Sequence, residues 1–146
     1  MAAGLVAFWG VLFWYWVIAW LLISQSTVPN YPLPQNLWYA LCIVLCLLGC
    51  VIMIAADAQK FYTLKFRQGL ITDGIHRTIR HPNYLGEIMI YSSFGLMAWH
   101  WGAVAILLAV WLLVFLPNMV AKERSLSRYS EWSAYKKRSG WLLPFL

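Results

Sequence analysis

The sequence predicts an all-α integral membrane protein with about four transmembrane helices, a loop on the cytosolic side and an amphipathic C-terminal tail. Of its 146 residues, 62% are hydrophobic and only 11% are charged, whereas a soluble domain is about 45–50% apolar. Its 10 Trp, 8 Tyr and 7 Phe suit a chain whose rings lie at membrane–water interfaces. No charged residue precedes Asp57. These observations exclude a water-soluble globular protein and predict one multi-pass domain over residues 1–146.

The first part of the chain supplies two of the expected spans. Residues 4–23 are uncharged and long enough to cross the ~30 Å hydrocarbon core as a helix. They lack the basic start and cleavage site of a signal peptide, so we expect this span to be retained. Residues 24–36 carry prolines and polar side chains without a charge, which indicates an extramembrane loop. Residues 37–56 form the second span, and Trp38 and Tyr39 anchor its start at the interface.

The second part of the chain repeats this alternation with charged connections. The basic residues of the chain fall into two blocks, and residues 57–83 contain most of the first block together with glycines and a proline. We expect a loop there. Residues 84–101 and 102–121 are the third and fourth spans, and Pro117 should kink or end the last helix early.

The basic residues predict the orientation in the membrane. They gather in residues 57–83 and 122–146, and basic loops remain on the cytosolic side, so both termini are expected there. The net charge of +6 is explained by this topology, which argues against a nucleic-acid partner. In the tail, Tyr129, Trp132 and Tyr135 recur every three residues, so we expect rings on one helical face that lies on the membrane or folds over the loop.

The cysteines and histidines do not predict a metal site. Cys42, Cys46 and Cys50 lie four apart in an apolar run, without His or carboxylate at ligand spacing. We interpret them as small residues at a helix–helix contact. No second ligand accompanies His76 or His81 at helical spacing, so a phosphate or backbone contact is the better interpretation for both.

A dense polar cluster precedes and enters the third span. A carboxylate within a span costs roughly 2.5–3.5 kcal/mol, so Glu87 needs a partner or a wet cavity unless it lies at the headgroup boundary. The cluster provides cations, a planar amide and an imidazole, as a nucleotide cofactor requires. An anionic lipid headgroup explains the arginines nearly as well. Its members before Glu87 are Arg77, Arg80, His81, Asn83 and Tyr84.

The segment Arg80-His81-Pro82-Asn83-Tyr84-Leu85-Gly86-Glu87 resembles the RHPNYxGE signature of the membrane steroid 5α-reductase C-terminal family, which is similar to sterol reductases. Residues 56–60 with 66–67 resemble the acidic entry motif of that family, and residues 135–145 resemble its C-terminal close. The resemblance covers residues 57–146 and implies that this part binds the cofactor.

The resemblance implies NADPH-dependent reduction of a carbon–carbon double bond in a lipid or steroid-like substrate that enters from the bilayer. It implies catalytic roles for Glu87 and Tyr84. Membrane lipids and a lipophilic small molecule are the expected partners. The residues expected to hold NADPH are Asp57, Arg77, Arg80, His81, Asn83, Tyr84, Glu87, Lys122, Arg124 and Tyr129.

Two other functions remain open at this stage. Isoprenylcysteine carboxyl methyltransferases and phospholipid N-methyltransferases, which use S-adenosylmethionine, share the RHPxYxG part and a similar Tyr-Lys-Lys-Arg ending. They usually lack the Glu after the Gly, and they carry a Glu-Glu pair where this chain has Lys122-Glu123-Arg124. Both departures favour the reductase. Because little beyond Tyr15 precedes the motif to activate a substrate, a third interpretation is a non-catalytic membrane subunit of a larger complex. Other membrane proteins, or further copies of the chain in a homo-oligomer, remain open as partners.

Overall fold

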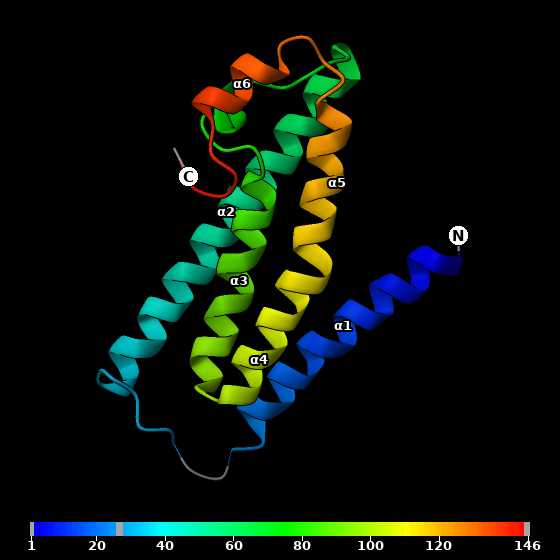
Figure 1. Cartoon of the computed structure of the whole chain (residues 1–146). Helices are drawn as coiled ribbons and strands as arrows, with labels where there is room; N and C mark the ends of the chain where they lie inside the picture. The colour runs from blue at the N-terminus through cyan, green and yellow to red at the C-terminus, as the bar shows by residue number, and fades with distance from the viewer. Residues whose placement is uncertain (1, 26–27, 145–146) are drawn as a thin grey trace.

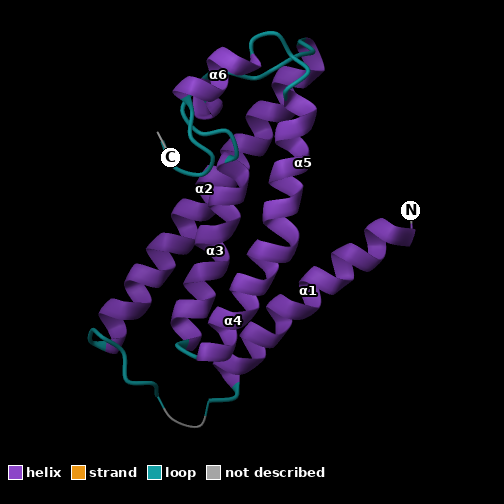
Figure 2. Ribbon diagram, in the orientation of Figure 1, coloured by secondary structure: helices purple, strands orange, loops and turns teal. Residues whose placement is uncertain are grey.

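The computed structural model describes residues 2–25 and 28–144, and within these ranges it consists of helices, loops and one isolated β-bridge between Ile79 and Gly140. Figures 1 and 2 show an elongated helical bundle capped by a short helix at one end. The expected helical class is therefore confirmed. Its elements are α1 (Ala2–Ile23), α2 (Gln35–Phe66), η1 (Gly74–His76), α3 (Pro82–Ala98), α4 (Trp101–Val110), η2 (Trp111–Phe115), α5 (Leu116–Leu126) and α6 (Trp132–Arg138).

Two of the described helices are long and apolar enough to cross a membrane. These are α2 and the continuous helix Trp101–Leu126, which is built from α4, η2 and α5. Only 17% and 28% of their most apolar windows are buried, so most of this apolar surface faces outward, as lipid contact requires. Leu113, for example, is 76% exposed.

Two helix ends differ from the sequence-based expectation. The segment 57–66 was expected in a loop, but α2 continues through it to Phe66. Its residues are polar, but they are compatible with a helix. No glycine interrupts the segment, because the nearest glycines are Gly49, within α2, and Gly69, after its end. Pro117 does not end the last helix, which runs on to Leu126. A π-helical turn precedes this proline, in which the Leu116 N–H donates to the Trp111 carbonyl.

Helices α2 and α3 approach closely where Gly49 faces Gly86. A Cβ atom on Gly49 would lie 2.7 Å from the carbonyl oxygen of Gly86, and one on Gly86 would lie 2.6 Å from that of Gly49. Small residues allow two helix backbones to touch in this way. This contact lays the polar end of α2 beside the start of α3.

Helix α1 packs on the bundle through its C-terminal half. Ile18 is buried in a cluster with Ala98, Ala103 and Leu107, against which Tyr15 also packs. Figure 1 shows the other half of α1 diverging from α5. Within the packed half, Trp16 and Trp20 are exposed and are not part of the described core.

The connections at the two ends of the bundle differ in charge. Figure 1 shows the 67–81 loop and α6 at one end, and the loop after α1 and the α3–α4 turn at the other. The tail folds back over the 67–81 loop, because Arg80 N–H donates to Gly140 O over 2.9 Å and Gly140 N–H donates to Thr78 O over 2.9 Å. Tyr129 lies in the turn before α6, so it does not share one continuous helical face with Trp132 and Tyr135 as expected.

Candidate functional site

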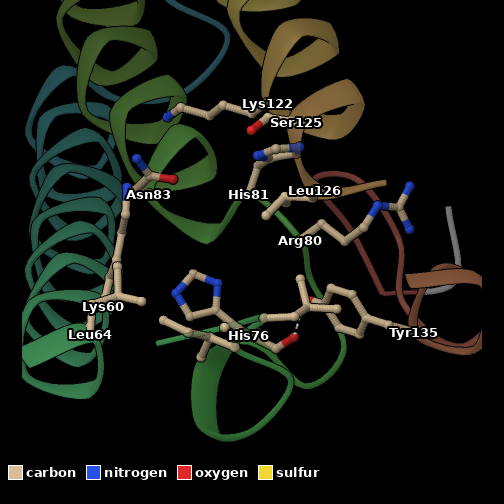
Figure 3. A pocket seen from close by; sticks show the side chains of 13 residues that line it. Lys60, Leu64, His76, Arg80, His81, Asn83, Lys122, Ser125, Leu126 and Tyr135 are labelled. Carbon is tan, nitrogen blue, oxygen red and sulfur yellow. Dashed lines mark hydrogen bonds between the residues drawn. The ribbon is translucent and has the colours of Figure 1, made fainter. Parts of the chain in front are cut away.

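A cavity of about 190 Å³ lies at the basic end of the bundle, where α2, α3, α5 and α6 meet the 67–81 loop (Figure 3). Its walls combine basic, amide and apolar side chains. They are Lys60, Leu64, Gly69, Leu70, Ile71, His76, Arg80, His81, Asn83, Lys122, Ser125, Leu126 and Tyr135.

The side-chain nitrogens of Lys60, Asn83 and Lys122 gather at one part of this cavity. Figure 3 shows Lys122 extending from α5 toward Asn83 on α3, with Lys60 rising from α2 below it. Neither lysine forms an ion pair within 4.0 Å with a carboxylate of the described chain. Lys122 Nζ lies 4.4 Å from the ring centroid of Tyr84, a cation–π contact that directs its amine. The cavity therefore presents positive charge to a ligand.

His76 adds an unsatisfied nitrogen to the same cavity. Its Nε2 is buried and has no hydrogen-bond partner among the described residues. Burial lowers the pKa of this imidazole, so the ring is neutral near pH 7 and one of its nitrogens can accept a hydrogen bond. The carbonyl of His76 accepts a 2.6 Å bond from Tyr135 Oη, and this bond ties the η1 turn to α6.

Arg80 and His81 share one carboxylate next to the cavity. Arg80 Nε lies 2.7 Å and His81 Nε2 lies 3.2 Å from Glu123 Oε1, and all three side chains are nearly buried. The Arg80 guanidinium also donates to the carbonyl oxygens of Lys136 and Ser139. Figure 3 shows this guanidinium pointing away from the cavity. Its hydrogen-bonding groups therefore connect the segment that precedes α3 with α5 and α6.

The structure distributes the other expected cofactor residues over separate places. Arg77 is exposed at the end of the η1 turn, outside the lining of the cavity. Arg124 lines a different pocket on the opposite side of α5. Tyr129 lines a groove of about 650 Å³ with Arg67 and Arg128. This groove adjoins the cavity, since Gly69 and Leu70 line both.

Glu87 lies deeper in the bundle, behind the cavity. It interacts electrostatically with Asp57 on α2 and Lys122 on α5, so three helices contribute charges to one region. The charge of Glu87 also acts on Tyr15, whose buried hydroxyl has no hydrogen-bond partner among the described residues. Tyr84 is only 7% exposed and packs against Phe115, with ring centroids 5.0 Å apart. Neither Glu87 nor Asp57 lines the cavity itself.

The expected set of cofactor residues omitted three polar groups that line the cavity. They are Lys60, His76 and Ser125. An extension of the second expected helix beyond residue 56 would have indicated Lys60 as a site residue. Lys60 follows Asp57 by three positions and shares its helical face. For His76 the sequence indicated only a phosphate or backbone contact, and for Ser125 it indicated nothing, because the folded loop and α5 bring these residues together.

A comparison with protein families gives one match. The profile of a family described as a protein of unknown function (DUF1295) matches residues 2–139. No curated protein and no solved structure shows significant similarity to the chain.

Proposed function

The chain belongs to the DUF1295 family, and we propose that it is a multi-pass membrane reductase that uses NADPH to reduce a carbon–carbon double bond in a lipid or steroid-like substrate. The observation that carries this proposal is the convergence of Lys60, Lys122 and Asn83 on one cavity, where neither lysine has a carboxylate partner within residues 2–25 and 28–144. The RHPNYxGE resemblance of residues 80–87 adds independent support.

The donor set fits NADPH better than S-adenosylmethionine. Lysine ammonium groups pair with phosphates, whereas they repel a cationic sulfonium. The Asn83 amide suits a carboxamide, and the neutral His76 ring offers its free nitrogen. The cavity holds only part of such a long molecule, but the adjoining groove extends it toward Arg128 and toward Arg67, which also pairs with Asp73 over 3.8 Å. Further phosphate groups of the cofactor would contact these arginines. When bound, NADPH supplies a hydride.

Glu87 and Tyr15 form the side of the site that faces the substrate. Glu87 lies one turn beyond Asn83 on α3, so it is placed deeper in the bundle than the cavity. Reduction of a double bond consumes one hydride and one proton. The buried Tyr15 hydroxyl, which has no hydrogen-bond partner among the described residues, is the group that we assign to deliver the proton.

We further propose that α1 and α3 span the membrane together with α2 and Trp101–Leu126. The uncharged connections and the basic ones lie at opposite ends of the bundle, and basic loops remain cytosolic. The cofactor site then opens to the cytosol, where NADPH is available, and substrate enters from the bilayer.

Thermal unfolding of the full chain in detergent tests the cofactor. A ligand at a hundred times its Kd stabilises a protein by about 2.7 kcal/mol, so saturating NADPH should raise Tm. Lys60→Gln and Lys122→Gln should reduce this shift. The control Lys65→Gln, an exposed position of α2 outside the cavity, should retain it. Stabilisation by S-adenosylmethionine but not by NADPH would replace the reductase with a methyltransferase.

Turnover provides the second test. NADPH consumption should be measured with a panel of enone lipids, beside methyl transfer from labelled S-adenosylmethionine. Glu87→Gln keeps the shape of the side chain but removes its charge. Under this proposal the Glu87 carboxylate accepts a hydrogen bond from a bound reactant, and loss of a charge-assisted hydrogen bond costs roughly 1.5–3 kcal/mol. We therefore expect reduction to slow by about one to two powers of ten. Methyl transfer without NADPH consumption would contradict the proposal.

A further inference from the structure

A second basic pocket lies on the other side of α5. It measures about 300 Å³, and Arg124 of α5 and Lys136 of α6 line it together with Trp132 and Trp141. Successive helical residues are about 100° apart, so Lys122, Ser125 and Leu126 face the first cavity while Val120, Glu123 and Arg124 face this one. The two pockets are therefore separate sites.

The charge of this pocket favours an anion. Its one lining carboxylate, Glu123, is already paired with Arg80 over 2.7 Å and contacts His81 over 3.2 Å. Arg124 and Lys136 are exposed, and neither forms an ion pair with a carboxylate in the described ranges. A phosphate group placed between them gains two cations.

An exposed apolar stripe runs along the membrane helix to Arg124. Leu116 and Val120 are 37% and 41% exposed, and their spacing of four residues puts them on one face of α5. Leu113, which is 76% exposed, precedes them in the η2 turn. Arg124 follows four residues after Val120. At 1.5 Å per residue, Leu116 lies about 12 Å from Arg124 along the α5 axis. Because Leu113 lies farther along the same helix, the stripe covers close to half of the ~30 Å hydrocarbon core. The dimensions match one acyl chain beneath one headgroup.

We propose that the second basic pocket, between α5 and α6, binds an anionic phospholipid. The phosphate lies between Arg124 and Lys136, and one acyl chain lies along Leu113, Leu116 and Val120. The rings of Trp132 and Trp141 lie at the level of the headgroup, where indoles are favoured. The bound lipid joins α6 to α5. Because α6 also supplies Tyr135 to the first cavity, the lipid supports one wall of that site.

The test uses the purified full chain in a zwitterionic detergent. Tm is measured during titration with phosphatidylglycerol, phosphatidylcholine or inorganic phosphate. We expect a saturable rise with phosphatidylglycerol that the other two do not reproduce. An equal response to phosphatidylcholine, or an equal response to inorganic phosphate, would overturn the proposal.

Two charge variants locate the site. The Arg124→Gln/Lys136→Gln protein should need at least tenfold more phosphatidylglycerol for half of the shift. The control Lys65→Gln/Lys137→Gln removes the same charge at exposed positions outside the second basic pocket and should respond as the parent does. An unchanged midpoint in the first variant would overturn the proposal. Lys122→Gln separates the two sites, because it should lose the NADPH shift and keep the lipid shift.

Discussion

Arg80 illustrates how a basic residue of the motif serves the fold. Its guanidinium holds Glu123 and the carbonyls of Lys136 in α6 and of Ser139 after it, and its side chain is only 7% exposed. Removing one partner of a buried ion pair costs about 3–5 kcal/mol. Arg80→Gln should therefore lower Tm strongly even without a ligand. Arg77→Gln, at the neighbouring exposed arginine, should change Tm little. Equal Tm values for the two variants would contradict this assignment.

His81 predicts a pH dependence of stability. Burial lowers its pKa to about 4 against the opposing effect of Glu123, whereas an unfolded histidine titrates near pH 6.5. As pH falls from about 6.5 to 4, the unfolded chain therefore takes up a proton that the folded chain does not, and stability declines by up to about 3 kcal/mol. His81→Gln should flatten the fall of Tm across this window. The same fall in parent and variant would show that another group causes it.

Local spacing predicted that polar residues gather before the third span, but it could not predict their partners. The cavity does bring together Arg80, His81, Asn83 and Lys122. Glu123, however, lies 43 positions after Arg80, and nothing in the local pattern indicates that the two side chains meet. A pairing of this kind depends on how α5 and α6 fold back, which is a property of tertiary structure.

At the scale of elements, the contact between α2 and α3 is the most sensitive to a single methyl group. In Gly49→Ala, the new Cβ would meet backbone at 2.7 Å, so the helices must separate, and overpacking of this kind costs about 1–3 kcal/mol. Gly95→Ala on α3 is the matched control, because its Cβ meets only the flexible end of Leu107. Thermal unfolding should show the larger loss for Gly49→Ala. A larger loss for Gly95→Ala would refute this account.

Hydrophobicity predicted where the long helices lie better than where they end. Apolar runs identify only the part of a helix that suits lipid. Residues 57–66 are too polar to be recognised as helical in this way. They still continue α2, because helix propensity and contacts with η1 do not require apolar side chains. Likewise, a proline usually interrupts a helix, but the η2 turn accommodates Pro117. The sequence contains no marker for that turn.

For the whole molecule, the separation of charged and uncharged ends is the property that sequence and fold share. The charge pattern requires no knowledge of tertiary structure, and the folded chain places both basic blocks at one end (Figure 1). The composite cavity depends on this arrangement, since Lys60 lies in the last turns of α2 and Lys122 lies in α5. A topology that separated them across the bilayer would abolish the proposed cofactor site.

Single cysteines test this topology after the three native ones are replaced. Gln68→Cys and Ser130→Cys lie in exposed loops at the basic end, whereas Asn30→Cys is exposed in the uncharged loop. In sealed, inside-out vesicles, an impermeant thiol reagent should label the first two positions and reach the third only after the membrane is permeabilised, because basic loops remain cytosolic. Ser139, which is buried and donates to Tyr135 O over 2.6 Å, would be a poor reporter. Labelling of Gln68→Cys and Ser130→Cys from opposite sides would exclude the cavity that joins α2 to α5.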